Sequence, residues 1–213
     1  MKNIRLFYKK TGNAKYVSHL DTVRFMSRLL RRAGLPVWYT EGFNPHLYIT
    51  FALPLSLGMK SEYEIADIRL TDDNYPCECI CELLNQNSTP DYCFFSAAEP
   101  EKKLTELTFA RFVVSFQDEG NLYEALESFM AQKEILVEKR TKKGDIKLIN
   151  AAEDIIDYEV KKDQNTQLNI TLPAGNNKNV NPDLIIKKFL GKTECFYEIN
   201  RVLLLDSDKK PLK

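Results

Sequence analysis

The chain has 213 residues, 44% of them hydrophobic, which is enough for one large domain or two small ones, each with its own core. No apolar run approaches the roughly 18 residues of a transmembrane helix, and the first residues lack the apolar core of a signal peptide. Five cysteines, an odd number, argue against a disulfide framework. We therefore expect a cytoplasmic protein that is not bound to a membrane.

The charges are unevenly distributed, although 30 basic and 30 acidic residues cancel to a net charge of zero. Residues 1–60 contain ten Lys or Arg and two acids, whereas residues 61–110 contain three basic and eleven acidic side chains. A concentrated positive field attracts phosphate backbones. The alternative is that the two segments neutralise each other across the folded surface.

The hydrophobic pattern of the first half predicts strands and helices in a recognisable order. Ser18 begins a helix, because Asp21 three residues later completes a capping box, and Gly34 ends it. The expected elements are a strand at 3–8, a helix at 18–33, strands at 37–40, 47–53 and 63–70, a helix at 76–87 and a strand at 92–97. We interpret this order as the β-α-β-β-α-β unit of a ferredoxin-like domain.

The order of elements recurs in the second half. The expected elements are a strand at 109–117, a helix at 122–130, a hairpin of 135–140 and 145–149, strands at 158–162 and 167–173, a helix at 181–191 and a strand at 196–205. The predicted fold class is therefore α+β, with two tandem ferredoxin-like domains, the second carrying an extra β-hairpin. The predicted domains are 1–98 and 108–213, joined by a linker at 99–107.

The first helix has an arginine face opposite its apolar stripe. Four arginines at i, i+4, i+7 and i+8, with three lysines upstream, form a band that suits bidentate phosphate contacts. The alternative is an ordinary solvated helix face. The predicted phosphate-binding residues here are Lys9, Lys10, Lys15, Arg24, Arg28, Arg31 and Arg32.

Both histidines fall in the positive segment. His19 opens the first helix, whose N-terminus favours a neutral imidazole. His46 ends the loop 42–46, where Tyr39 and Phe43 offer flat faces for a base and Asn44 helps to fix a turn. We expect the loop to lie near the N-terminus of the first helix, so that both histidines share one anion site. Each histidine could instead be an ordinary structural residue.

Two further groups of residues are candidates for a binding site, a basic hairpin tip and a cluster of cysteines. The hairpin tip has four basic residues suited to a nucleic-acid backbone, Lys139, Arg140, Lys142 and Lys143, although lysine is also common in plain β-turns. The three cysteines at 77, 79 and 81 lack the Cys-x-x-Cys spacing of metal sites, so we expect core packing, no metal and no cofactor. The chain also lacks Cys-x-x-x-Cys-x-x-Cys, phosphate-binding glycine loops and a Gly-x-Ser-x-Gly turn.

Six segments carry a family resemblance. They are Phe7–Lys10, Ser18–Asp21, Arg31–Pro36, Gly42–His46, Ala52–Gly58 and Glu138–Gly144. Through them the chain resembles the bacterial radical-SAM-linked, or radical-SAM-associated, proteins, a domain of unknown function. The resemblance implies a radical S-adenosylmethionine (SAM) protein encoded nearby as partner. Leu47 and the segment 147–150 depart from the family pattern.

These observations favour an RNA-binding accessory protein that works with a radical SAM enzyme, in RNA modification or processing. One alternative is a metal-independent ribonuclease that uses His19 and His46 as acid and base, so the sequence leaves open whether the protein is an enzyme. Another is a protein-docking module that binds no nucleic acid. A weaker, fold-level analogy to RNA-processing endonucleases built from paired ferredoxin-like domains does not bear on function.

Overall fold

The computed structural model describes residues 1–118, 121–140, 146–175 and 178–213. It is a mixed α+β protein whose sheets are mostly antiparallel and whose described residues include four α-helices. The chain divides into two compact units. The first comprises Met1–Leu107 and Lys210–Lys213, and the second comprises Thr108–Lys209.

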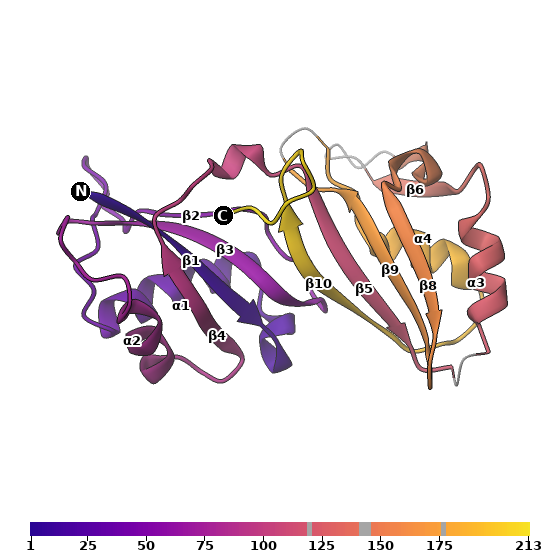
Figure 1. Ribbon diagram of the computed structural model, residues 1–213, viewed down its shortest axis with the longest axis horizontal. Helices are drawn as coiled ribbons and strands as arrows, with labels where there is room; N and C mark the ends of the chain where they lie inside the picture. The colour runs from indigo at the N-terminus through magenta and orange to yellow at the C-terminus, as the bar shows by residue number, and fades with distance from the viewer. Residues whose placement is uncertain (119–120, 141–145, 176–177) are drawn as a thin grey trace. The chain divides into compact units, whose positions relative to one another are not determined.

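The first unit is a four-stranded antiparallel sheet with helices packed on it. Its elements are β1 (Lys2–Lys10), the 3-10 helix η1 (Gly12–Tyr16), α1 (His19–Arg32), β2 (Ile49–Phe51), β3 (Lys60–Leu70), α2 (Ile80–Asn87), β4 (Tyr92–Ala98) and η2 (Leu104–Glu106). The strands lie in the order β2-β3-β1-β4, and each neighbouring pair is antiparallel. Figure 1 shows these strands with α1 and α2 against them.

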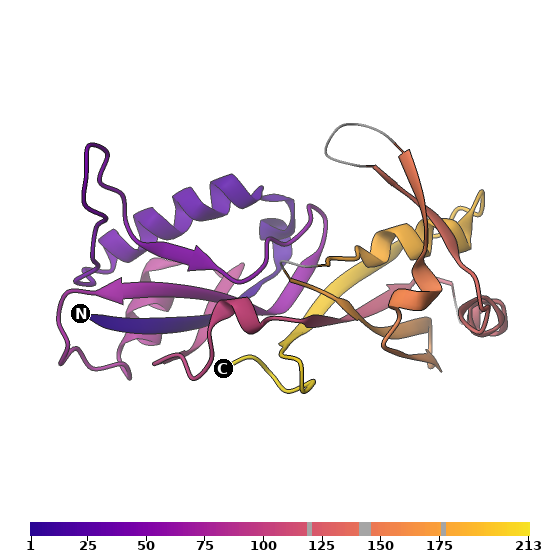
Figure 2. The same cartoon turned by 90° about the horizontal axis from the view of Figure 1, so that it is seen from above.

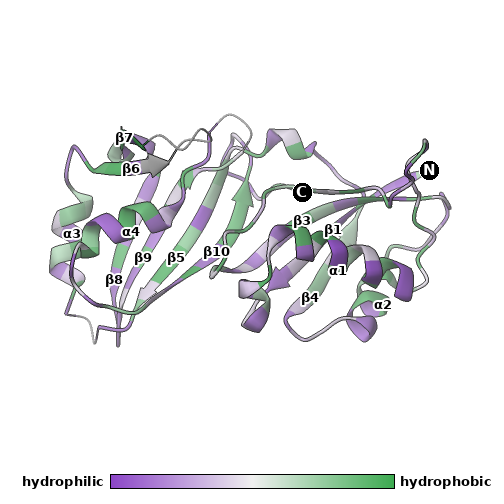
Figure 3. Ribbon diagram, turned by 180° about the vertical axis from the view of Figure 1, so that it is seen from behind, coloured by the Kyte–Doolittle hydropathy of each residue, from purple (hydrophilic) through white to green (hydrophobic). Residues whose placement is uncertain are grey.

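The core of the first unit lies between the sheet and α1. Alternate residues of β1, Ile4, Leu6 and Tyr8, are buried in one cluster with Met26 and Leu30 of α1. Because strand side chains alternate between faces, the intervening residues of β1 point to the other side of the sheet. The ribbon of α1 alternates between hydrophilic and hydrophobic residues (Figure 3), as expected of an amphipathic helix.

The second unit repeats the alternation of strands and helices. Its elements are β5 (Phe109–Phe116), α3 (Tyr123–Met130), β6 (Leu136–Arg140), β7 (Ile146–Asn150), the 3-10 helix η3 (Ala151–Asp154), β8 (Asp157–Lys162), β9 (Thr166–Pro173), α4 (Pro182–Leu190) and β10 (Tyr197–Leu205). Four strands form an antiparallel sheet in the order β10-β5-β9-β8, and β6 and β7 pair as a separate hairpin.

Several predicted boundaries differ from the structure. The strand expected at 37–40 makes only isolated bridges, Val37 with Leu70 and Tyr39 with Leu47. The helix expected from residue 76 begins at Ile80, where no side chain caps its N-terminus. The linker expected at 99–107 belongs to the first unit and includes η2.

The end of the chain also departs from the predicted second domain of 108–213. Residues Lys210–Lys213 belong to the first unit. Leu212 is fully buried, its carbonyl accepts a hydrogen bond from the Tyr63 hydroxyl at 3.3 Å, and the Lys213 carbonyl accepts one from Arg5 at 2.8 Å. These contacts join positions more than a hundred residues apart, so local sequence patterns do not reveal them.

Candidate functional site

The helix α1 is built as the sequence predicts at its N-terminus. The Ser18 hydroxyl accepts a hydrogen bond from the Asp21 amide at 3.2 Å and donates one to the Asp21 carboxylate at 2.7 Å, which confirms the predicted cap. Gly34 has a φ of +70°, the left-handed geometry that favours glycine after a helix. Because Met26, Leu29 and Leu30 are buried, the opposite face of α1 and its arginines point to solvent.

The α1 arginines are exposed and only partly engaged. Arg24 pairs with Asp21 at 3.0 Å, Arg31 donates to the Ser27 carbonyl at 3.1 Å, and Arg32 donates to the Asn87 carbonyl at the end of α2. Within the described part of the chain, no carboxylate lies within ion-pair distance of Arg28, Arg31 or Arg32. We call these three residues the arginine face. No acid among the described residues neutralises their positive charge.

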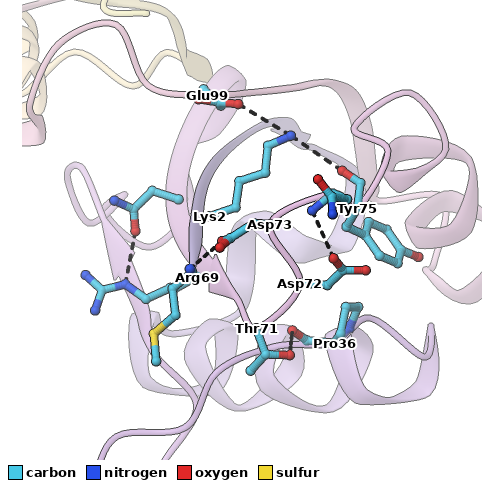
Figure 4. A network of polar contacts seen from close by, with 11 residues as sticks. Lys2, Pro36, Arg69, Thr71, Asp72, Asp73, Tyr75 and Glu99 are labelled. Atoms are coloured by element: carbon cyan, nitrogen blue, oxygen red, sulfur yellow. Dashed lines mark hydrogen bonds and ion pairs between the residues drawn. The ribbon is translucent and has the colours of Figure 1, made fainter.

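The acidic stretch of residues 61–110 instead pairs with β1 and the N-terminus. Its ion pairs are Glu62 with Lys9 at 2.7 Å, Asp67 with Arg5 at 2.7 Å, Glu99 with Lys2 at 3.4 Å and Asp73 with the amino group of Met1. Figure 4 shows Lys2 reaching both Glu99 and the Tyr75 carbonyl. These acids therefore pair with the positive charges of β1 and the N-terminus, and none of the described acids forms an ion pair with the arginine face of α1.

The three lysines predicted to bind phosphate differ in how accessible their ammonium groups are. Lys9 is half-exposed in its pair with Glu62, and Lys15 lies 5.2 Å from the centroid of the Tyr16 ring. Lys10 is only 3% exposed, and its ammonium group donates to the Val17 carbonyl at 2.8 Å. A buried ammonium cannot reach a phosphate backbone, so the assignment of Lys10 to the phosphate site is wrong.

His19 lies at the first position of α1. Its ring meets the Phe51 ring edge-on, with 5.2 Å between centroids. Burial of the imidazole, with the positive charge of Lys10 as a smaller cause, lowers the pKa of His19 below its ordinary value, and the carboxylate of Glu64 partly opposes this. The ring is therefore neutral near pH 7.

We expect this pKa to make stability depend on pH. Because the native pKa of His19 lies below the unfolded value of about 6.5, the unfolded state binds more protons in that window. The contribution of His19 to the free energy of unfolding is complete above about pH 6.5. It is lost as the pH falls through the native pKa of His19. Chemical denaturation of wild type and His19→Gln between pH 5 and pH 8 measures this effect. We predict that wild type loses stability relative to the variant on acidification, and equal curves would contradict the prediction.

The segment between α1 and β2 forms a hairpin that projects from the first unit (Figure 2). Its base is held by Arg69, whose guanidinium lies 5.0 Å from the Trp38 ring and 4.6 Å from the Tyr48 ring. The Trp38 amide also donates to the Arg69 carbonyl at 2.7 Å. The two rings lie 5.6 Å apart, so cation–π contacts of one guanidinium with two neighbouring rings hold the base of the hairpin.

The tip of the hairpin presents the predicted aromatic and histidine residues to solvent. The His46 amide donates to the Thr40 hydroxyl at 3.1 Å, and His46 Nδ1 lies 3.0 Å from that hydroxyl and 3.2 Å from the Asn44 carbonyl. These contacts orient the imidazole. Phe43 is fully exposed and Tyr39 is 40% exposed, so both rings are accessible to a ligand.

The structure does not bring His19 and His46 together. Register places Phe51, the ring partner of His19, opposite Ala66, whereas Ile49 lies opposite Ile68. His46 precedes Phe51 by five residues, or about 16 Å of extended chain. β2 runs parallel to β1, so the end of β2, and not its start, lies beside the N-terminus of α1. The predicted shared anion site is therefore wrong.

The basic hairpin tip of the second unit lies mainly outside the described residues. Lys142 and Lys143 are not described. Lys139 and Arg140 are described as backbone in β6, where they pair with Lys147 and Ile146. Their assignment to nucleic-acid binding stays a prediction.

The described residues contain no cluster of three or more metal-ligating side chains. All five cysteines are free, and Cys77 lies before α2, not within it. No described helix is long and apolar enough to cross a membrane.

A family model described as "Uncharacterized protein conserved in bacteria (DUF2344)" matches residues 3–182. The chain belongs to this bacterial family. No curated protein matches the sequence.

The solved structures that match share little sequence with the chain. A chain from "Crystal Structure of a Cbf5-Nop10-Gar1 Complex" matches with a TM-score of 0.50 and 10% identity, covering 95% of this chain and 48% of that one. This chain therefore spans about half the length of that structure. An unknown protein from Galdieria sulphuraria matches with a TM-score of 0.28, 11% identity and coverage of 95% and 99%.

Proposed function

We propose that the protein is a cytoplasmic RNA-binding accessory protein that presents RNA to a radical SAM enzyme for modification or processing. The observation that carries the proposal is the arginine face of Arg28, Arg31 and Arg32, which no described carboxylate neutralises. Arginine binds phosphate through two parallel N–H donors. A row of such side chains along one helix suits a phosphate backbone better than it suits a small anion.

We further propose that both units are ferredoxin-like. The orders β2-β3-β1-β4 and β8-β9-β5-β10 are the order expected of a split β-α-β unit, with one helix after the first strand and one before the last. The extra hairpin of β6 and β7 interrupts the second unit. Because ferredoxin-like folds serve many functions, the strand order supports the proposed ferredoxin-like architecture and says nothing about RNA binding.

The accessory role rests on two observations. His19 contacts Phe51 at the end of β2, whereas His46 precedes the start of that strand, which argues against an acid and base pair of the kind that a ribonuclease needs. The chain also lacks the cysteine motif of a radical SAM cluster, so the chemistry would come from the partner. The partner itself is implied by the resemblance to radical-SAM-linked proteins.

Filter binding of total tRNA at about 50 mM salt, in EDTA, tests the proposal. We expect bound RNA that remains intact. Folded protein that retains no RNA would contradict RNA binding, and a pull-down with and without nuclease would then test the protein-docking alternative. Cleavage that His46→Ala abolishes would favour the ribonuclease.

A further inference from the structure

The face of the first sheet that points away from its helices carries an aromatic cluster. Phe7 of β1 lies 5.4 Å from Tyr63 of β3 and 6.2 Å from Phe95 of β4, and Tyr63 lies 5.9 Å from Phe95, measured between ring centroids. One ring thus comes from each of three adjacent strands. We call these three residues the aromatic platform.

Two β-bulges place the platform. Phe7 pairs with Ser96 and Tyr8 pairs with Phe94, so Phe95 is an extra residue in β4. On the other side of β1, Tyr8 pairs with Glu64 and Lys10 with Ser61, so β3 also has an extra residue, beside Tyr63. Bulges re-aim side chains and are frequent next to binding sites. The pairing of β1 is thus irregular beside Phe95 on one side and beside Tyr63 on the other.

The three rings differ in exposure. Phe7 is 6% exposed and forms the floor of the cluster, whereas Phe95 is 45% exposed. The Tyr63 hydroxyl is held by the Leu212 carbonyl at 3.3 Å. The platform is therefore a fixed set of rings with an accessible face at Phe95.

A positive side chain borders the platform. Lys9 follows Phe7 by two residues, which places it on the same face of β1, and it is half-exposed in its pair with Glu62. Exposed ion pairs contribute less than about 1 kcal/mol, so the ammonium group can exchange the carboxylate for a phosphate. Aromatic rings on a four-stranded antiparallel sheet, with a cation at their edge, match the chemistry of unpaired nucleobases on a phosphate backbone.

We propose that the aromatic platform stacks unpaired bases of single-stranded RNA, with Phe95 as the main contact ring. This inference rests on the RNA-binding function proposed above and specifies its substrate class. It also assigns RNA contacts to a sheet face that sequence patterns did not indicate. Duplex RNA, whose bases are already stacked, has no unpaired base to offer to the platform.

Fluorescence anisotropy with a labelled, unstructured 12-nucleotide RNA and the matching duplex tests the inference. Phe95→Ala should weaken single-strand binding about 5- to 100-fold, the loss of one stacked base, and change duplex binding less than about twofold. Phe196→Ala is the matched control, since Phe196 is 58% exposed in the second unit. Phe95→Trp should keep the affinity, and its fluorescence should be quenched by RNA. Thermal unfolding of each variant checks that it is folded.

The outcomes separate the two proposals. If wild type binds single-stranded RNA and Phe95→Ala binds it equally well, the platform is wrong although RNA binding stands. Equal losses for single strand and duplex, or Phe95→Trp without quenching, would also overturn the platform. If wild type binds neither RNA, the proposed function and the platform both fail.

Discussion

Arg28→Glu/Arg31→Glu is expected to weaken the binding of total tRNA by at least about 100-fold at low salt. A charge-assisted hydrogen bond contributes about 1.5 kcal/mol at the low end of its range, and 1.4 kcal/mol is a factor of ten. Both arginines lack a carboxylate partner among the described residues, so the substitutions break no ion pair of the native protein. Filter binding of the purified variant measures the effect.

The matched control is Lys188→Glu/Lys192→Glu. These lysines lie at the end of α4 and just after it in the second unit, are exposed, and give the same change in net charge. We expect this variant to bind tRNA within about threefold of wild type, because it leaves the arginine face intact. If both double variants lose affinity equally, binding depends on net charge alone and the arginine face is not a site.

Arg5→Ala is expected to destabilise the protein by about 3–5 kcal/mol. This is the cost of removing one partner of a buried ion pair, which leaves the other charge buried without a counter-charge. Arg5 is fully buried, and its guanidinium donates to both Asp67 oxygens at 2.7 Å and to the Lys213 carbonyl at 2.8 Å. Removal of the guanidinium leaves the Asp67 carboxylate without its cation and frees the end of the chain. For a protein of this size the thermal midpoint should fall by about 10 °C.

Lys9→Ala is the control for Arg5→Ala. Lys9 lies on the same strand and face, but its pair with Glu62 is half-exposed, so its loss should cost less than about 1 kcal/mol. Differential scanning calorimetry of the two variants compares them directly. Midpoints within about 2 °C of each other would show that the Arg5–Asp67 pair does not stabilise the fold.

Local patterns in the sequence predict the elements well where one face is buried. The apolar spacing of α1 and the cap at Ser18 predict the helix and its exposed arginines, because both depend on residues three or four apart. Alternation predicts β1 and β3 for the same reason. The segment 37–51 is less predictable, because its few pairings depend on Arg69 and Leu70, about 30 residues away.

The candidate site was only partly predictable because its contacts depend on strand register. The strand expected at 37–40 would make the strand after His46 the third of the unit, antiparallel to β1. In the structure it is the second strand, β2, which runs parallel to β1, and this direction separates His19 from His46. Nor does alternation reveal that Lys10 is buried or that Asp67 meets Arg5 across β1 and β3. The bulges at Phe95 and Tyr63 break the alternation that a sequence pattern assumes, so the aromatic platform emerges only from the folded chain.

The salt dependence of tRNA binding tests the central claim most directly. Each neutralised phosphate contributes about 0.7–0.9 to the slope of log affinity against log salt, so the three residues of the arginine face predict a wild-type slope of about −2 to −3. The slope of Arg28→Glu/Arg31→Glu should be shallower by about two. A wild-type slope near zero, or equal slopes for wild type and variant, would contradict phosphate binding by the arginine face.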